Sequence, residues 1–224
     1  MARTRLAAVP PEARPEAAAV AAGVGAAEFD ELRDAAAGCR ACDLWSRATQ
    51  TVFGRGPVPA RLMLVGEQPG DQEDVQGEPF VGPAGRILDR ALEEAAIDRD
   101  GVFVTNVVKH FKWRPAPSGK RRLHERPDRV EIGACLPWVQ SELAVVRPEA
   151  LVLLGATAAQ ALVGPKVRVT RDHGVPLESE LAPLVVATIH PSAVLRAQGG
   201  PARDEAYAGL VADLTTVARG LSGD

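Results

Sequence analysis

The residues of this chain that could do chemistry stand at the ends of short apolar segments. They offer a carboxylate, amides, hydroxyls and an imidazole, in chain order Glu67, Gln68, Asn106, Thr157, His190 and Ser192. In an open parallel sheet, ligands bind in the crevice beyond the carboxyl ends of the strands. If the apolar segments are such strands, a carboxylate, an amide and an imidazole share one pocket.

A second group lies between residues 109 and 129, where eight Lys and Arg residues stand against two acids. At its centre is the run 120–124, Lys-Arg-Arg-Leu-His, and Phe111 and Trp113 are interleaved with the cations. Clustered cations with aromatic residues indicate a nucleic-acid surface. A solvated charged loop is the alternative. The overall net charge of -3 carries no such signal, so a contact with nucleic acid would be local.

The three cysteines form a third group. Cys39 and Cys42 have the two-residue spacer of a metal or cluster site, and Cys135 is distant in sequence. An odd number of cysteines excludes a framework made only of disulfides. Three thiolates and one imidazole complete a four-coordinate site, with His110 and His173 as candidates. Three unrelated reduced cysteines are the alternative.

These residues can meet only if the apolar segments form one sheet. Strands are predicted at 61–65, 102–105, 150–154 and 184–188, and helices at 29–37, 86–96, 128–146, 156–163 and 202–221. Strands that alternate with helices predict a parallel sheet covered on both faces. The expected fold class is α/β, a three-layer α/β/α sandwich with a central, mainly parallel four-stranded sheet.

The length of 224 residues suits one such domain. Residues 1–26, rich in Ala and Pro, are predicted to be a flexible leader, and 27–224 a single domain. Pro and charged residues interrupt the N-terminal segment, which argues against a signal peptide. No apolar run approaches the ~18 residues of a membrane span. We therefore expect a cytoplasmic protein without membrane contact.

Several segments together resemble the family 4 uracil-DNA glycosylases. Residues 66–70 (GEQPG), 73–74 and 77–85 (GEPFVGPAG) are similar to the first motif of that family. Later landmarks follow in the same order, at 105–109 (TNVVK), 154–158 (LGATA) and 190–192 (HPS). The resemblance covers about residues 30–218. It is closest to the UdgX subgroup, because of Gln68 and of the loop 120–124.

The resemblance implies a [4Fe-4S] cluster held by Cys39, Cys42, His110 and Cys135. The family has a fourth cysteine where this chain has His110, and the UdgX subgroup shares that replacement. Imidazole ligands of iron-sulfur clusters have precedent. Loss of one ligand is the competing interpretation of this position.

The resemblance also implies excision of uracil from a flipped nucleotide, a hydrolase activity of DNA base-excision repair. Phe80 would stack on the base and Asn106 would read its edge, because one amide can donate to uracil O4 and accept from N3–H. His190 would stabilise the charge that develops on O2, and Glu67 would assist at the sugar. The implied uracil-binding set also includes Gln68, Gly70 and Asp71, and the implied DNA-binding set is Lys120, Arg121, Arg122 and Ser192.

In the UdgX subgroup a histidine of the basic loop attacks C1′ and stays bonded to the abasic site. By resemblance His124 would do so here, in a single-turnover reaction assisted by Glu67. A turnover glycosylase in which water attacks is the alternative, and a uracil-DNA-binding protein without catalysis is the second alternative. The expected partner is uracil-containing DNA, and the expected state is a monomer.

Overall fold

The fold is known from a computed structural model that describes residues 26–119 and 121–223. Its centre is a parallel sheet of four strands in the order β2-β1-β5-β6. The strands are β1 (Leu62–Gly66), β2 (Val102–Asn106), β5 (Ala150–Leu154) and β6 (Leu184–Thr188). The expected α/β class with a four-stranded sheet is confirmed, and every strand pair in this sheet is parallel.

The strands are nearly continuous apolar runs because helices cover both faces of the sheet. β1, β2 and β5 are buried at all five of their positions. The predicted bounds of β5 and β6 agree with the structure. β1 and β2 end one residue later than predicted, so Gly66 and Asn106 are the last residues of their strands.

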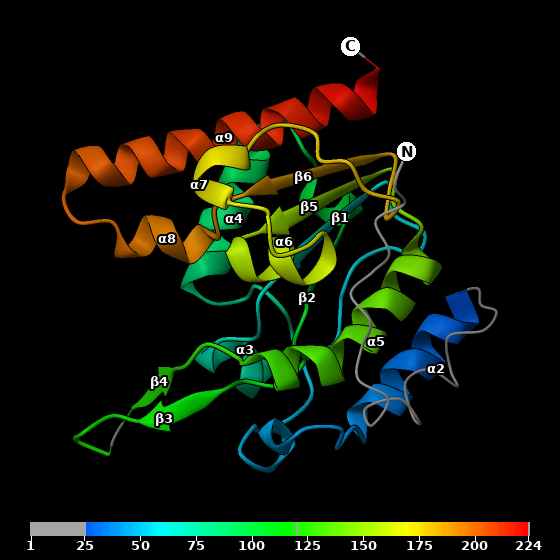
Figure 1. Ribbon diagram of the computed structural model, residues 1–224, viewed down its shortest axis with the longest axis vertical. Coiled ribbons are helices and arrows are strands. Elements are labelled where there is room, and N and C mark those ends of the chain that lie inside the picture. Colours follow the sequence, from blue (N-terminus) through cyan, green and yellow to red (C-terminus); the bar gives the residue numbers. More distant parts are fainter. Residues whose placement is uncertain (1–25, 120, 224) are drawn as a thin grey trace.

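Helices form the two outer layers (Figure 1). One layer contains α2 (Ala26–Ala37), α5 (Arg129–Val146), α6 (Ala156–Leu162) and α7 (Val169–Asp172). The other contains α4 (Pro83–Glu94), α8 (Pro191–Arg196) and α9 (Gly200–Ser222). The remaining short helices are η2 (Asp43–Ser46), α3 (Asp71–Gln76) and η3 (Arg99–Gly101). The three-layer arrangement is therefore confirmed.

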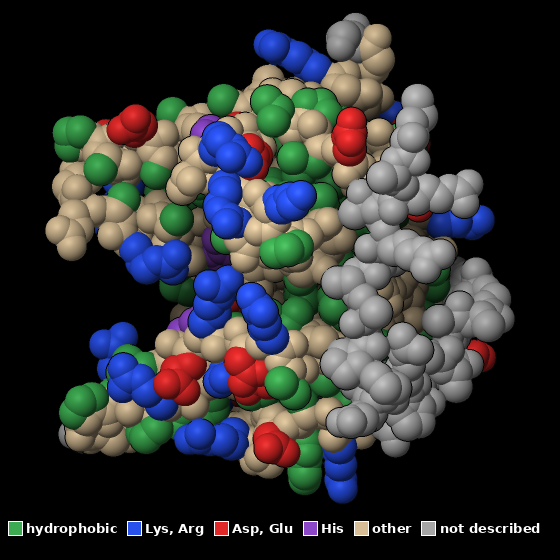
Figure 2. Space-filling view, in the orientation of Figure 1, with side chains coloured by type: hydrophobic (Ala, Val, Ile, Leu, Met, Phe, Trp, Pro, Cys, Tyr) green, Lys and Arg blue, Asp and Glu red, His purple; other side chains and the backbone are tan. Residues whose placement is uncertain are grey.

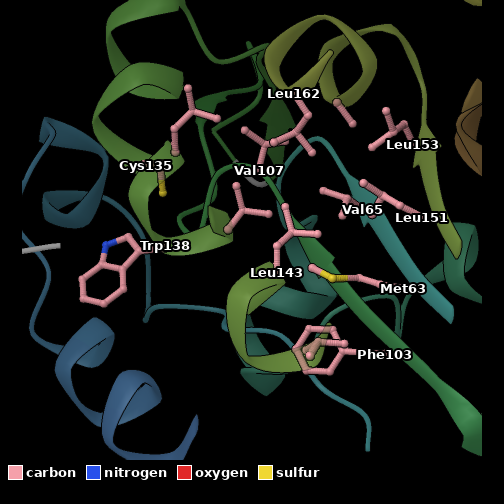
Figure 3. Close-up of a cluster of buried hydrophobic side chains, with 14 of the residues drawn as sticks. Met63, Val65, Phe103, Val107, Cys135, Trp138, Leu143, Leu151, Leu153 and Leu162 are labelled. Atoms are coloured by element: carbon pink, nitrogen blue, oxygen red, sulfur yellow. The ribbon is translucent and has the colours of Figure 1, made fainter. Parts of the chain in front are cut away.

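Alternate strand residues enter the two cores, as the pleat of a strand requires. Met63 and Val65 belong to the core under α5, whereas Leu62 and Leu64 belong to the core under α4 and α9. Figure 3 shows the first core, with Cys135 at its margin on α5.

The sequence prediction missed the three shortest α-helices and one hairpin. α3, α7 and α8 have only six, four and six residues, too few for a helical period to be visible. The hairpin joins β3 (Trp113–Pro115) to β4 (Arg122–His124), with Trp113 opposite His124. It projects from the body of the molecule (Figure 1). The basic run 120–124 therefore lies largely on a strand.

Residues 1–25 lie outside the described residues, so the predicted leader is not tested, and Ala26 already belongs to α2. Lys120 is also outside them. Among the residues described, no helix is both long enough and apolar enough to cross a membrane.

Candidate active site

A cleft of about 970 Å³ opens at the carboxyl ends of the strands. Its walls come from the segments after β1, β2, β5 and β6, from α8 and from the hairpin. Figure 2 shows this cleft between the body of the molecule and the hairpin, with Lys and Arg side chains along both of its edges. The carboxylate, amide and imidazole expected to share a pocket, Glu67, Asn106 and His190, all line it.

Asn106 and Phe80 form the floor of the cleft. The Asn106 side chain is buried, and among the described residues its Oδ1 is the one buried side-chain polar atom without a hydrogen-bond partner. Phe80 has a positive φ of 59°, a strained conformation for a residue with a large side chain. Gly85 permits it, because a Cβ there would collide with the Phe80 carbonyl. This loop geometry agrees with a functional placement of Phe80.

Gly66, the last residue of β1, leaves space for both groups. A Cβ at Gly66 would lie 2.7 Å from Phe80 Cζ and would also collide with Asn106 Oδ1. We expect Gly66→Ala to slow any reaction catalysed in this cleft about 100-fold, since displacing Phe80 or Asn106 by about 1 Å can have that effect. Gly101→Ala is the matched control, because a Cβ there meets nothing within 4 Å. Equal rates for the two variants would contradict the close packing described here.

His190 is held in one tautomer by its neighbours. Its Nδ1 accepts a hydrogen bond from the backbone N–H of Ser192 at 3.1 Å and lies 2.8 Å from the Ser192 hydroxyl. A backbone N–H can only donate, so the proton of the neutral ring is on Nε2. Burial, and then the charges of Arg196 and His124, lower the pKa of His190 to about 4. His190 is therefore a neutral donor through Nε2 near pH 7.

Glu67 follows β1 and is held by Thr157 at the start of α6. The Thr157 hydroxyl donates to Glu67 Oε2, and Arg126 Nε donates to Thr157 Oγ1 at 3.1 Å. Arg126 Nε is also 3.8 Å from Glu67 Oε2. Thr157 and Arg126 therefore orient the carboxylate. The sequence marks Thr157 only as a strand-end residue and Arg126 only as one of the basic cluster, because their contact spans 31 residues of sequence.

His124, on β4, brings a second imidazole to Glu67. His124 Nε2 is 3.8 Å from Glu67 Oε1 and 2.9 Å from Gln68 Nε2. The amide nitrogen of Gln68 can only donate, so the lone pair of His124 is on Nε2 in this arrangement. Partial burial lowers the pKa of His124, although Glu67 opposes that effect. The ring is therefore a neutral base or nucleophile near pH 7.

Gln68 is engaged with the hairpin. Its Nε2 donates to the carbonyl of Glu125 at 2.8 Å, and its Oε1 accepts from the backbone N–H of Lys112 at 2.9 Å. These bonds hold both ends of the hairpin against the first motif. The expected role of Gln68 in uracil binding stays a prediction, and its visible contacts position His124.

The guanidinium group of Arg122 is paired with two carboxylates of α3. It pairs with Asp71 and with the fully buried Asp74, each at 2.5 Å, and lies over the rings of Phe111 and Trp113. These contacts fasten β4 to α3. Its assignment to DNA stays a prediction.

The other expected site residues lie around the cleft. Arg121, Gly70, Asp71 and Ser192 line it. Gly70 is the N-cap of α3. The Ser192 hydroxyl lies 2.7 Å from Arg196, a cation at the rim of the cleft that no motif of the sequence marks. The expected contacts of these residues with uracil or DNA stay predictions.

The three cysteines gather at the margin of the first core, near α2, η2 and α5. Cys39 and Cys42 pack against the cluster that contains Cys135. Two N–H groups point to their sulfurs: Trp138 Nε1 to Cys39 and Lys109 N to Cys135, both at 3.2 Å. Burial raises the pKa of Cys135 to about 12. The free Cys135 thiol is therefore protonated near pH 7, and a metal would have to displace its proton.

The two candidate histidines differ in their surroundings. His110 is buried, which lowers its pKa, and its Nε2 lies 3.0 Å from Thr51 Oγ1, so Nδ1 is the atom left for a ligand bond. His173 instead pairs with Asp213 at 3.0 Å. Within residues 26–119 and 121–223, no three or more His, Cys, Asp and Glu side chains lie close enough to hold a single metal ion. The arrangement thus offers no mononuclear site. A cluster of several irons separates its ligands more widely.

Comparison with known proteins adds to this geometry. Residues 53–215 match the sequence profile described as the Uracil DNA glycosylase superfamily. The chain is 38% identical over 159 residues to the type-4 uracil-DNA glycosylase of Thermotoga maritima, covering 70% of this chain and 78% of that protein. For the enzyme of the same name from Pyrobaculum aerophilum, the identity is 35% over 176 residues, covering 75% and 85%. That from Archaeoglobus fulgidus is 36% identical over 164 residues, covering 70% and 78%. All cleft residues named above lie within the matched range, whereas Cys39 and Cys42 precede it.

Proposed function

The chain belongs to the uracil DNA glycosylase superfamily, and on that premise we propose that it excises uracil from DNA by breaking the bond between the base and C1′ of deoxyribose. The reaction needs a group that selects the base, a group that stabilises the departing base, and a group that acts at the sugar. Asn106, His190 and Glu67 can take these three roles.

The unpaired Oδ1 of Asn106 is the observation that carries this proposal. A buried acceptor without a partner is unfavourable, and native structures contain few of them. The N3–H of uracil would supply the missing donor, and the Asn106 NH2 would donate to O4. Cytosine presents the opposite pattern at these two atoms, so a fixed amide selects against it.

His190 and Glu67 supply the chemistry. When the glycosidic bond breaks, uracil leaves with the bonding electrons, and negative charge gathers on O2. The neutral His190 would donate its Nε2–H to that oxygen. Glu67 would stabilise the cationic sugar and take a proton from the attacking water. The water oxygen bonds to C1′, and uracil takes up a proton from solvent.

The comparisons favour this turnover reaction over the covalent capture implied by the resemblance to UdgX. The named relatives are type-4 uracil-DNA glycosylases, and nothing in those names refers to a covalent product. The test is release of free uracil from a uracil-containing oligonucleotide in tenfold excess over protein. Several uracils released per protein molecule support the proposal. Release of one uracil or fewer per protein contradicts turnover, and tight binding without release would indicate a binding protein.

Covalent capture is a second candidate function, favoured by the position of His124. Its Nε2 lies in the cleft, 3.8 Å from Glu67 Oε1, and accepts a hydrogen bond from Gln68 Nε2. In this reaction Nε2 would bond to C1′ as uracil leaves, and the ring would then lose its Nδ1 proton to solvent. The imidazole would be a poor leaving group, so the protein would stay attached to the sugar.

We expect His124→Ser to abolish any DNA adduct that survives hot detergent, because serine lacks the imidazole. Uracil release should persist, since Asn106, His190 and Glu67 remain. A denaturing gel for the adduct and a uracil assay on the same samples measure both effects. A full adduct yield in the variant would exclude His124 as the nucleophile, and no adduct in the wild type would exclude the second candidate.

We also propose that Cys39, Cys42, His110 and Cys135 hold a [4Fe-4S] cluster. Three thiols at one margin of the core, two N–H donors aimed at their sulfurs and a neutral His110 suit such a group. When bound, the cluster would cross-link the segment 39–42, which follows α2, to α5. No step of the proposed reaction passes through it.

Iron content tests this cofactor proposal. We expect about four irons per chain in protein purified without oxygen, and a broad visible absorption. Cys135→Ser should lower the iron content, whereas His110→Cys should keep it. His173→Gln is the matched control, because His173 pairs with Asp213 instead. Iron retained in His110→Ala but lost in His173→Gln would reverse the assignment of the two histidines.

A further inference from the structure

A buried ion pair lies beneath the base-selecting residue. Lys109 and Glu142 are 1% and 0% exposed, and Lys109 Nζ is 2.6 Å from Glu142 Oε2. Lys109 follows β2 by three residues, and Glu142 is on α5. A buried ion pair is weak evidence for stability, because apolar residues of similar volume often replace one without loss. Stability alone therefore does not explain why this ion pair is present.

The hydrogen bonds of Lys109 lead directly to Asn106. The ammonium group has three protons and three acceptors: Glu142 Oε2, Thr105 Oγ1 at 2.6 Å and the backbone carbonyl of Asn106 at 2.7 Å. The backbone N–H of Lys109 in turn donates to Cys135 Sγ. The side chain thus folds back along the chain and holds the end of β2.

Glu142 keeps the ammonium group in place. Its Oε1 accepts the backbone N–H of Gly54 at 2.8 Å, and both of its oxygens lie within 3.0 Å of Thr105 Oγ1. The carboxylate is therefore tied to two segments besides Lys109. Because all partners are buried, the pair has one arrangement, and the Asn106 carbonyl is fixed with it.

We propose that Lys109 is a positioning residue for base selection, which sets the Asn106 amide through its bond to the Asn106 carbonyl. The inference rests on the proposed function, because that function assigns the selection of uracil to the Asn106 amide. Lys109 touches no substrate. It acts through the backbone of Asn106, and Glu142 holds it in place.

Two substitutions separate positioning from stability. Lys109→Met combined with Glu142→Met replaces the pair by apolar side chains of similar length, so the thermal midpoint should stay near that of the wild type. The bond to the Asn106 carbonyl is nevertheless lost. Val217→Ala is the opposite case: it removes apolar volume from the core under α9, so the thermal midpoint should fall while the bonds of Lys109 stay intact.

The measurements are the thermal midpoint, the single-turnover rate of uracil release at saturating DNA, and the ratio of uracil to cytosine release. In the double variant we expect a rate about 100-fold lower and a smaller ratio. In Val217→Ala both should stay near wild type when they are measured well below its thermal midpoint. A double variant with wild-type rate and ratio would overturn the proposal, as would a Val217→Ala variant as impaired as the double variant.

A second readout does not depend on catalysis. The side-chain amide resonance of Asn106, followed by 15N NMR, should shift or broaden in the double variant and stay unchanged in Val217→Ala. An unchanged resonance in both would overturn the positioning role. A wild-type protein that releases no uracil would instead overturn the proposed function, and the resonance would still test Lys109. If the double variant does not fold, Lys109→Met combined with Glu142→Gln removes the same bond, and without the lysine the new amide can accept from the Gly54 N–H and donate to Thr105 Oγ1.

Discussion

Asn106→Asp is expected to lower the rate of uracil release on the order of 1,000-fold, because it removes the amide donor to O4 and adds an acceptor in its place. The position is buried, so a charged carboxylate there would have little solvent to stabilise it. An ionised Asp would also repel the O4 carbonyl. Single-turnover release of uracil from an oligonucleotide measures the loss.

The comparison of bases distinguishes selection from general damage. Cytosine carries a donor at N4, so the Asp variant should lose less activity on cytosine than on uracil. Asn106→Ala is the matched control, because it removes the amide without adding an acceptor. An unchanged preference for uracil in Asn106→Asp would mean that another group reads the base edge.

His190→Ala is expected to lower the rate about 100- to 1,000-fold, the usual effect of removing one preorganised donor to a developing oxyanion. The loss should appear in the single-turnover rate, with little change in DNA affinity, because the donor acts on charge that develops during the reaction. Ser192→Ala is the matched comparison for His190→Ala. It keeps the backbone N–H that fixes the tautomer of His190, so its effect should be smaller. Equal losses in the two variants would contradict this role.

The same residue links pH to stability. The folded-state pKa of His190 is about 4, below the ordinary value of 6.5, so the unfolded chain binds more protons between these pH values. The wild type should therefore lose stability as the pH falls from 6.5 to 4, by on the order of 3 kcal/mol from this group. His190→Ala should show a correspondingly flatter dependence of unfolding free energy on pH. An identical dependence in both proteins would show that His190 is not neutral in the fold.

The sequence by itself determined the sheet and the meeting of its strand ends. Four apolar segments separated by helices are compatible with few arrangements, and parallel strands bring their carboxyl ends to one edge. Glu67, Asn106 and His190 could therefore be assigned to one pocket from their places after the segments alone. The family motifs lie in the same places, because the pocket requires them there.

The partners of individual side chains were decided only by the tertiary structure. The basic run predicts that Arg122 contacts DNA, and only the structure shows that it also pairs with Asp71 and Asp74, which are 51 and 48 residues away in sequence. The hairpin was missed as well, since two strands of three residues show no clear alternation. No local sequence pattern predicts which carboxylate a given cation will pair with, because the pairing depends on how distant segments pack. The same holds for Lys109 and Glu142, whose pairing across 33 residues exists only once α5 has packed on β2.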